Sequence, residues 1–338
     1  MHNSDGRLGT PKIAIIVIVL VIIGALVVGY MTIQKNKAYK EADIGSNASA
    51  GTYRHITYHG DKYDYNSNIT NILVVGVDST GKMQTESAYG SAARSDVIML
   101  LSLDKYNHST TAIAFSRSTM AEIQQFDLDG TKIGKAYKQL AYAFEEGNGG
   151  KASCENTADA VSNLLGGIPI DHYIVVNVNA IPKANELVGG VTVTAPNDDL
   201  ADEYDISKGD EVTLTDETAQ AFLQYRDIDK EYSNEGRMER AHVYMNAYMD
   251  AFQKLLKKNV NENINLIEDS GLKEYMLTDI TRNQYVGLFN LLNDVNIDDI
   301  SYFTPDGTNE VKSNLERFII NKSILKKELV KVFYIKSR

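Results

Sequence analysis

Apolar residues along the chain alternate between short strand-like runs and helix-like spacings. The first strong run, residues 71–78, is rich in β-branched residues and ends on a carboxylate, which indicates a buried strand. Similar runs predict strands at residues 97–103, 111–115, 172–178 and 190–195. Spacings of three and four predict helices around residues 136–144 and at 155–165, 215–224 and 237–257. Strands interleaved with helices predict a layered α/β fold.

An uncharged apolar segment, residues 13–33, stands apart from this pattern. As a helix its 21 residues would reach about 30 Å, the thickness of bilayer hydrocarbon. It is longer than the apolar region of a secretory signal, so we expect an uncleaved transmembrane helix after a short N-terminus, residues 1–12. Basic residues flank both sides, and charge therefore leaves the orientation open. Residues 34–68 are expected to form a stalk or linker before one domain, residues 69–338, with its core at about 70–258.

Composition and charge narrow the classes of function. The chain is 43% hydrophobic and 23% charged, which excludes a disordered or collagen-like protein. Its formal net charge of −11 disfavours binding along nucleic acid, because such binding needs a spread of Lys and Arg. A single cysteine, Cys154, excludes an internal disulfide and a multi-cysteine zinc site.

Acidic and arginine residues stand where the predicted strands begin and end. Asp78 closes the first strand, Arg94 and Asp96 precede the second, and Arg117 follows the third. Because ligand sites gather at strand ends in α/β sheets, we expect these three loops to converge. For any one of these residues alone, a surface ion pair is the commoner explanation.

Two carboxylates and several guanidiniums suit a pyrophosphate bound with Mg²⁺. Mg²⁺ takes one or two carboxylates together with phosphate oxygens, which fits Asp78 and Asp96. Arginine offers forked donors to phosphate, and five of the ten arginines lie in motif positions: Arg94, Arg117, Arg226, Arg237 and Arg240. Arg237 and Arg240 are expected at the start of a helix and on one face of it, where the helix N-terminus favours phosphate. A solvated helix face is the plain alternative for this pair.

A series of motifs in one order resembles the LytR-CpsA-Psr family. The motifs are Val-Gly-Val-Asp78, Ala-Arg94-Ser-Asp96, Phe-Ser-Arg117, Lys132-Ile133, Leu164-Leu-Gly-Gly-Ile-Pro-Ile-Asp171-His-Tyr, Leu187-Val-Gly-Gly-Val-Thr-Val, and Tyr225-Arg226 through Gly236-Arg237-Met-Glu-Arg240. They run from about residue 70 to about residue 258. The resemblance implies α-β-α layers, with a mixed central sheet flanked by helices, behind one transmembrane helix.

The resemblance also implies a function. Members of such a family are Gram-positive envelope enzymes that move a glycopolymer phosphate, for example teichoic acid or capsule, from a polyprenyl-pyrophosphate carrier to peptidoglycan. The likeness implies a cytoplasmic N-terminus, a single span in the cell membrane and an extracellular domain. It implies that Asp78 and Asp96 hold Mg²⁺ or Mn²⁺, and that the isoprenoid tail occupies an apolar tunnel between sheet and helices. The pyrophosphate ligands would be Arg94, Arg117, Arg226, Arg237 and Arg240, and the catalytic residues would be Asp78, Arg94, Arg117 and Arg237.

The chain departs from the family pattern at three places. Serines flank Arg117 where relatives have Pro-Arg-Asp, so we expect this guanidinium to be held more loosely. The Tyr-x-Arg-x-Arg segment keeps one arginine, Arg226, with Gln224 as one reading of the other position, and Ala241 stands where relatives have Gln. Two alternatives follow: a noncatalytic scaffold or attenuator that binds polyprenyl-pyrophosphate precursors, and a pyrophosphatase that uses water. A transcriptional regulator is disfavoured by the span and the acidic charge.

Overall fold

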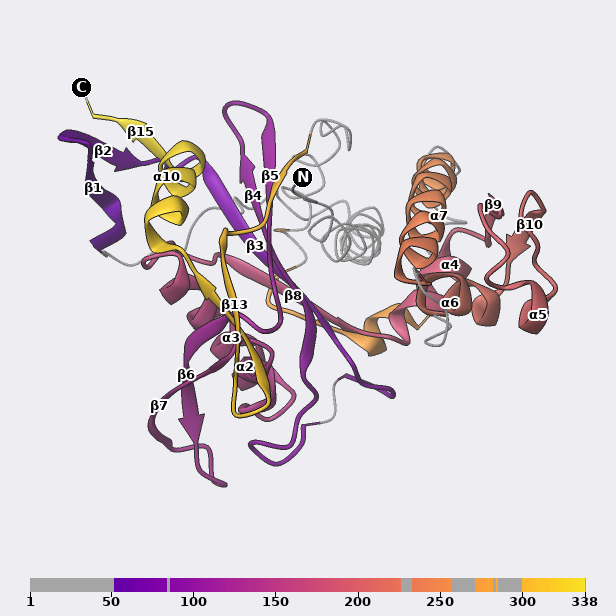
Figure 1. The fold of residues 1–338 in the computed structure, drawn as a ribbon, viewed down its shortest axis with the longest axis horizontal. Helices are drawn as coiled ribbons and strands as arrows, with labels where there is room; N and C mark the ends of the chain where they lie inside the picture. The colour runs from indigo at the N-terminus through magenta and orange to yellow at the C-terminus, as the bar shows by residue number, and fades with distance from the viewer. Residues whose placement is uncertain are drawn as a thin grey trace, which may run out of the picture. The chain divides into compact units, whose positions relative to one another are not determined.

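The computed structural model describes residues 52–83, 86–225, 233–256, 271–281, 284 and 300–337. Contacts divide the chain into two compact units (Figure 1). We call Lys40–Asn177 with Met276–Arg338 the sheet unit, and Met1–Tyr39 with Val178–Tyr275 the helical unit. The predicted N-terminus and span, residues 1–33, lie outside the described residues. Among the residues that are described, no helix combines the length and the apolar character needed to cross a bilayer.

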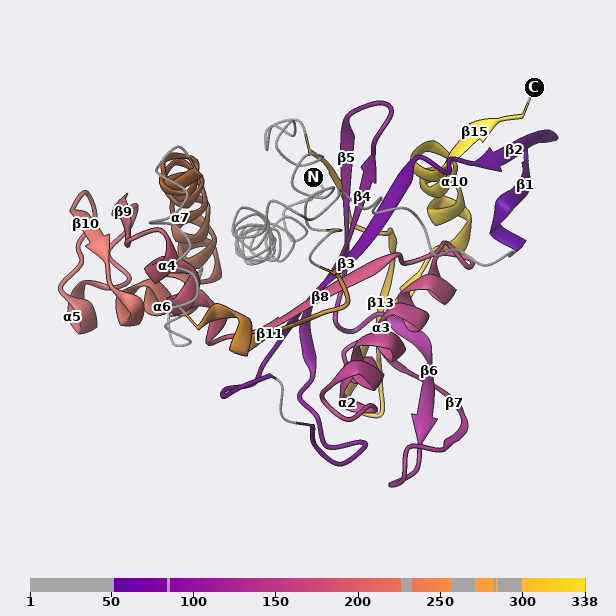
Figure 2. The same ribbon diagram turned by 180° about the vertical axis from the view of Figure 1, so that it is seen from behind.

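The sheet unit is built around a six-stranded mixed sheet. The strands, in order across the sheet, are β11 (Met276–Thr278), β8 (His172–Asn177), β3 (Ile69–Val77), β4 (Ser95–Asp104), β5 (Ser109–Phe115) and β12 (Ser301–Phe303). Strand β3 is parallel to β8 and antiparallel to β4, β4 is antiparallel to β5, and β5 is parallel to β12 (Figure 2). The expected mixed central sheet is confirmed.

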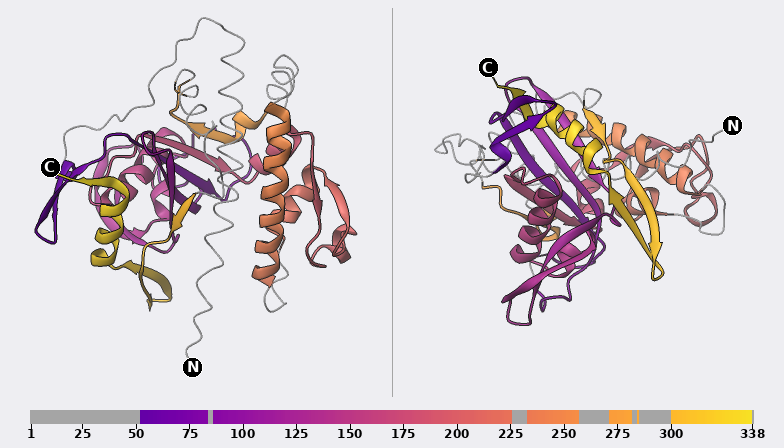
Figure 3. Two further views of the ribbon diagram at one scale, coloured as in Figure 1. Left: turned by 90° about the horizontal axis from the view of Figure 1, so that it is seen from above. Right: turned by 60° about the vertical axis from the view of Figure 1, so that its left-hand side comes forward.

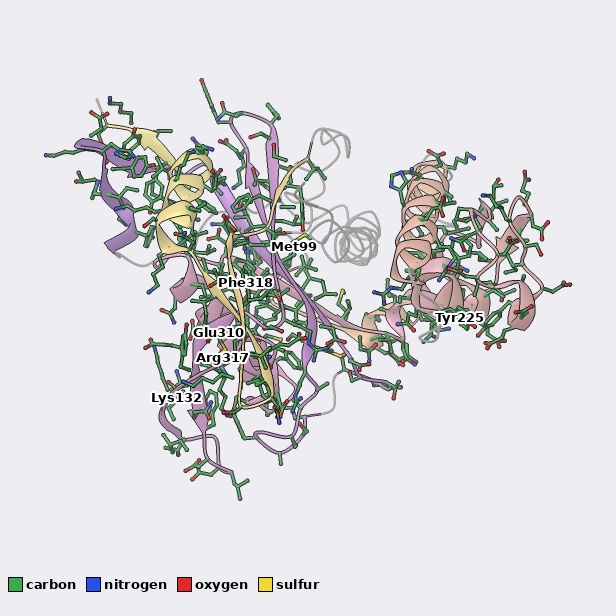
Figure 4. The ribbon with its side chains drawn as sticks, viewed as in Figure 1. Met99, Lys132, Tyr225, Glu310, Arg317 and Phe318 are labelled. Carbon is green, nitrogen blue, oxygen red and sulfur yellow. The ribbon has the colours of Figure 1, made fainter. Side chains whose placement is uncertain are left out.

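Smaller elements complete the sheet unit. They are a three-residue 3-10 helix (Thr52–Arg54), a sheet of β1 (His55–Tyr58), β2 (Asp61–Tyr65) and β15 (Tyr334–Lys336), the hairpins β6 (Met120–Phe126) with β7 (Lys132–Gln139) and β13 (Gly307–Lys312) with β14 (Leu315–Ile320), and the helices α2 (Tyr142–Glu145), α3 (Lys151–Leu164) and α10 (Lys322–Phe333). In the β13–β14 hairpin, Glu310 and Arg317 lie opposite each other and form a 2.9 Å ion pair (Figure 4). Because β2 pairs with β15, residues 52–65 belong to this folded unit, although the sequence placed them in a linker.

Helices α2, α3 and α10 cover one face of the main sheet. Side chains of the three helices and of the sheet form one hydrophobic cluster, which includes Leu73, Val75, Leu100, Ile113, Phe144, Val161, Leu329 and Phe333. The opposite face is also buried, because Val74, Met99 and Ile174 have no exposed surface. Burial on both faces explains why β3 reads as a continuous apolar run rather than an alternating one.

The predicted helix around residues 136–144 is wrong in its first part. Residues Lys132–Gln139 form strand β7, in which Ala136 pairs with Ile123 of β6. Only Tyr142–Glu145 is helical. A turn that contains Asp129 and Gly130 connects the two strands, and the pairing of this hairpin overrides a weak helical spacing.

The helical unit contains short elements around one long helix. They are α4 (Ala180–Leu187), β9 (Val191–Thr194), α5 (Ala201–Tyr204), β10 (Glu211–Leu214), α6 (Asp216–Gln224), α7 (Ser233–Leu256) and a 3-10 helix (Leu272–Tyr275). The long helix α7 is drawn in orange in Figure 3. Tyr244 and Tyr248 are fully buried, which confirms the apolar stripe predicted for α7. At the start of α6, the side chains of Thr215 and Thr218 accept hydrogen bonds from each other's backbone N–H groups, so a threonine completes the capping box.

A buried asparagine joins several strands of the sheet unit. Asn71 of β3 is fully buried; its Nδ2 donates to Tyr65 Oη at 3.0 Å and to the Pro169 carbonyl at 2.9 Å. Its Oδ1 accepts a 2.7 Å hydrogen bond from Ser102 Oγ, and its backbone N–H donates to Asp171 Oδ2 at 2.8 Å. One side chain therefore connects β2, β3, β4 and the segment that enters β8.

We expect Asn71→Ala to lower the free energy of unfolding by about 2–4 kcal/mol, because it leaves Ser102 and the Pro169 carbonyl without a buried partner. Urea unfolding of the full-length chain measures this change. Asn163→Ala, at an exposed position of α3, is the matched control and should change stability by less than about 0.5 kcal/mol. Equal losses in the two variants would contradict a special role for Asn71.

Candidate active site

The predicted strand-end residues of the sheet unit share one edge of the main sheet. Strand β4 is antiparallel to both β3 and β5, so the end of β3, the start of β4 and the end of β5 lie side by side. This arrangement places Asp78, Arg94, Asp96 and Arg117 on adjoining loops. The expected convergence of these three loops is therefore what the structure shows.

A bulge lies at this edge and gives Asp96 its position. Gly76 of β3 pairs with Val97, but the next residue, Val77, pairs with Ser95, so Asp96 is the extra residue of β4. A β-bulge bends the strand and changes the direction of a side chain. Gly76 lets the strands approach closely here, since a Cβ on it would lie 3.1 Å from Val97 Cβ. Because of the bulge, the Asp96 side chain does not follow the regular alternation of side chains between the two faces of the sheet.

Arg117 forms an ion pair with Asp96. Its Nη1 lies 2.5 Å from Asp96 Oδ1, and the two side chains are 51% and 40% exposed. We expected the absence of a carboxylate at Ser118 to leave this guanidinium loosely held, but Asp96 supplies a carboxylate from the neighbouring strand. Exposed pairs contribute little to stability, so a ligand can displace this one at small cost.

The carboxylate of Asp78 affects the pKa of Asp96. Its pKa is raised, chiefly because the carboxyl group is partly buried; the charge of Asp78 raises it further, and Arg117 opposes both effects. Asp78 and Asp96 therefore lie close enough to repel each other. Within the described ranges no group of three or more His, Cys, Asp or Glu residues is arranged to hold a metal. Two carboxylates are enough for Mg²⁺, which keeps several waters and takes phosphate oxygens.

Arg94 connects the end of β3 with helix α2. Its backbone carbonyl accepts a 3.2 Å hydrogen bond from Asp78 N–H, while its Nε donates to Glu145. The guanidinium carbon lies 4.2 Å from the centre of the Tyr142 ring, a cation–π distance. The hydrogen bond from Arg94 to Glu145 raises the pKa of the guanidinium, which stays charged.

Backbone hydrogen bonds tie the loops together. Ser95 N–H donates to the Ala141 carbonyl at 3.1 Å, and Ala141 N–H donates to the Arg117 carbonyl at 3.1 Å. The segment after β7 thereby holds the Arg94 and Arg117 loops at a fixed spacing. The loop after Asp78 is held separately, because Asn177 Nδ2, at the end of β8, donates to the Gly81 carbonyl at 2.6 Å.

Sequence reasoning missed Lys138 as a neighbour of this edge. Its Nζ lies 5.9 Å from the centre of the Tyr142 ring that Arg94 also covers, and it pairs with Glu146. The sequence analysis missed this position because it predicted a helix around residues 136–144 instead of strand β7. A strand assignment for β7 would have put Lys138 beside Met120 and Ala121 at the end of the hairpin nearest the site.

The arginines of the helical unit are placed differently from the prediction. Helix α7 begins at Ser233, so Arg237 and Arg240 do not open it, and the argument from free N–H groups at a helix N-terminus is wrong for them. Arg226 lies outside the described residues, and the role of Arg237 stays a prediction. Ala241 is fully buried, so the departure from Gln falls at a packing position.

Arg240 is a buried structural residue. Its side chain is 1% exposed, its Nε donates to the Phe222 carbonyl at 2.9 Å, and its Nη2 donates to the Tyr225 carbonyl at 2.5 Å. Its Nη1 donates hydrogen bonds to Asn197 Oδ1 and Asp199 Oδ2. All three guanidinium nitrogens thus donate hydrogen bonds to groups of the protein, and we do not include Arg240 among the proposed pyrophosphate ligands.

Known proteins share this fold and part of this sequence. TagU of Halalkalibacterium halodurans, a polyisoprenyl-teichoic acid–peptidoglycan teichoic acid transferase, is 29% identical over 176 residues, 52% of this chain and 51% of that protein. TagV of Bacillus subtilis, a transferase of the same description, is 31% identical over 166 residues, 47% of this chain and 39% of that protein. The chain thus spans about half the length, or less, of these curated relatives.

Solved structures extend the likeness to most of the fold. The crystal structure of B. subtilis TagV superposes with a TM-score of 0.54 at 22% identity, covering 79% of this chain and 96% of that one. A structure described as TagT bound to LI-WTA gives a TM-score of 0.52 at 19% identity, covering 78% and 90%. The model of the LytR_cpsA_psr family matches residues 27–332. By this match over most of its length, the chain belongs to the LytR_cpsA_psr family.

Proposed function

We propose that this protein transfers a glycopolymer phosphate from a polyprenyl-pyrophosphate carrier to a hydroxyl group of peptidoglycan. The observation that carries the proposal is the pair Asp78 and Asp96, set beside Arg94 and Arg117 on adjoining loops of one sheet edge. The names of TagU and TagV, teichoic acid transferases acting on peptidoglycan, support the same reaction class. The polymer is a teichoic acid, a capsule chain or a similar anionic glycan.

Asp78 and Asp96 are the proposed ligands of Mg²⁺, for which Mn²⁺ is a chemical substitute. The fit rests on two neighbouring carboxylates: burial chiefly raises the pKa of Asp96, the charge of Asp78 raises it further, and a cation between the two groups would relieve their repulsion. When bound, the ion neutralises charge on the phosphate oxygens and on the leaving group. The described residues contribute no further acidic or histidine ligands to a larger site.

The arginines of the edge are the proposed ligands of the pyrophosphate oxygens. Arg117 would exchange Asp96 for a phosphate oxygen, and this exchange is easy because both side chains are about half exposed. Arg94 presents a planar guanidinium that Glu145 and Tyr142 already orient, so less rotamer freedom is lost on binding. Arg226 and Arg237, which belong to the helical unit, stay predictions from the sequence, and Arg240 is left out because its guanidinium is buried in hydrogen bonds.

The reaction needs no covalent enzyme intermediate. The acceptor oxygen forms a bond to the phosphorus that carries the glycopolymer, and the bond from this phosphorus to the oxygen of polyprenyl phosphate breaks. The proton of the acceptor hydroxyl passes to a base, and Asp78 is the candidate because of its place at this sheet edge. Polyprenyl phosphate leaves with the bridging oxygen and its electron pair.

We also propose a place in the cell for this reaction. Residues 13–33 supply an uncharged stretch long enough for one membrane span, and the proposed carrier and acceptor lie outside the cytoplasm. The protein would be a single-pass protein of a Gram-positive cell membrane, with a cytoplasmic N-terminus and an extracellular catalytic part.

The proposal is tested by incubating the purified full-length chain with polyprenyl-pyrophosphoryl glycan, Mg²⁺ and peptidoglycan oligomers. We expect release of polyprenyl phosphate together with linked product, and a loss of about 100-fold or more in Asp96→Asn, because it removes a metal ligand. Arg54→Gln, at an exposed position outside the motifs, is the control and should keep full activity. Release without linkage would replace the proposal by a pyrophosphatase, and carrier binding without turnover would replace it by a scaffold.

The carboxylate pair has its own test, which is independent of turnover. Asp78→Asn should lower the pKa of Asp96, because it removes a like charge, and Arg117→Gln should raise it, because it removes an opposite charge. Carboxyl-carbon NMR titration of isotope-labelled aspartate in the full-length chain measures both shifts. Since the folded-state pKa is raised, ionisation of Asp96 costs stability; the cost begins as the pH rises through the pKa of the unfolded state and is complete once the pH exceeds the folded-state pKa. An unchanged pKa in Asp78→Asn would mean that the carboxylates do not interact.

A further inference from the structure

Lysines are concentrated at one end of the sheet unit, on α10 and β15. We call this group the basic patch; its members are Lys322, Lys326, Lys327, Lys331 and Lys336, and all five side chains are exposed. Glu328 is the one acidic residue in the segment 322–336, which therefore has a net charge of +4. The whole chain has −11, so the rest of it carries −15. A basic segment in an acidic chain is a candidate contact for an anionic surface.

Most of this positive charge is not neutralised within the sheet unit. Two of the five lysines form exposed ion pairs, Lys331 with Glu328 at 2.9 Å and Lys336 with Asp61 at 2.7 Å. The other three have no acidic partner among the residues that the structure describes. Exposed ion pairs are weak, so an anionic surface can compete for the two paired lysines as well.

Helix α10 is held in place by its apolar side. Its buried residues include Leu325, Leu329 and Phe333, which belong to the hydrophobic cluster under the main sheet. Because this side packs on protein, α10 cannot bury it in a bilayer as an interfacial amphipathic helix does. The contact left to it is made by the lysines, with the exposed side chains of Ile324 and Ile335 beside them.

The basic patch lies at the point where the described chain begins. Strand β15 pairs with β2, and β2 pairs with β1, which follows the 3-10 helix at Thr52–Arg54. Residues 34–51 separate this point from the proposed membrane span. Even fully extended, at about 3.5 Å per residue, they reach no more than about 60 Å. A chain anchored by residues 13–33 therefore keeps the basic patch close to the membrane.

The proposed active-site edge lies at the opposite end of the sheet unit (Figure 1). The Phe333 carbonyl of α10 accepts a 2.8 Å hydrogen bond from Asn66 N–H, shortly before β3 begins, whereas Asp78 directly follows β3. The nine residues of β3 extend over about 30 Å. A sheet unit that rests on its basic patch therefore holds Asp78 away from the bilayer.

We propose that the basic patch docks the sheet unit on anionic phospholipid headgroups of the membrane in which the chain is anchored. This inference rests on the proposed place of the protein in the cell. Near an anionic surface each lysine contributes about fivefold to the affinity, whereas the acidic remainder of the chain is repelled. Docking through α10 therefore sets an orientation in which the active-site edge faces the peptidoglycan.

The test places the full-length chain in lipid nanodiscs and measures energy transfer between a dye on the protein and acceptor dyes on the headgroups. Cys154 is buried, so Ser323→Cys, at an exposed position of α10, supplies a single reactive thiol. Transfer should be high in discs that contain phosphatidylglycerol, low in pure phosphatidylcholine, and lost at about 1 M salt, where screening acts within about 3 Å. A dye at Leu128→Cys, in the β6–β7 turn, should show low transfer in both lipids.

Charge variants of the Ser323→Cys chain identify the residues responsible. Lys322→Gln with Lys327→Gln should lower the docking equilibrium constant in phosphatidylglycerol discs about 25-fold, or fivefold for each lysine. The corresponding pair of arginine substitutions should keep docking, because it keeps the charge. Lys135→Gln with Lys151→Gln, at exposed positions of β7 and α3, is the matched control and should leave docking unchanged.

Three results would overturn the basic patch as a membrane contact. They are equal transfer in the two lipids, an equal loss in the two pairs of glutamine variants, and transfer that ignores the lipid but changes when poly(glycerol phosphate) is added. The last result would assign the lysines to an anionic polymer. Flotation with vesicles at about 1 M salt reads the span separately. Flotation with equal transfer in both lipids would keep the proposed anchor and reject the patch, whereas no flotation with phosphatidylglycerol-dependent transfer would reject the anchor and keep the patch.

Discussion

The pairing of β4 between β3 and β5 is the constraint on which the proposed site depends. Antiparallel pairing on both sides brings two strand ends and one strand start to the same edge. A slip of one residue would move every side chain to the other face, and burial on both faces resists such a slip. The bulge at Asp96 is the one local exception, and it lies where the proposed chemistry needs a carboxylate outside the regular alternation.

The charges at this edge are not there for stability. Burial and, to a smaller extent, the charge of Asp78 raise the pKa of Asp96, and the ion pair between Asp96 and Arg117 is too exposed to contribute much to stability. Groups held at an energetic disadvantage are typical of binding sites. Arg240 shows the contrast, because its buried guanidinium is bonded to backbone carbonyls and to Asp199, as a structural arginine should be. Arg117 and Arg240, both motif arginines in the sequence, thus differ: Arg117 is exposed in an ion pair with Asp96, whereas Arg240 is buried and stabilises the fold.

Much of the sheet and part of the site could be predicted from the sequence. The continuous apolar run of β3 and the polar residues at its end were enough to predict a buried strand and a ligand edge. The β7 strand was missed because its exposed, lysine-rich residues carry no clear period of two, and the start of α7 was misplaced because its first residues are polar. The burial of Arg240 and the Asp96–Arg117 pair depend on tertiary contacts that residue spacing does not encode.

The central claim is that Asp78 and Asp96 hold a divalent cation beside the phosphate-binding arginines. The most direct measurement is anomalous X-ray scattering from crystals of the full-length chain grown with Mn²⁺. The account predicts an anomalous peak at about 2.1 Å from carboxylate oxygens of both residues. A peak only at other residues, or none beside this pair at saturating Mn²⁺, would contradict it.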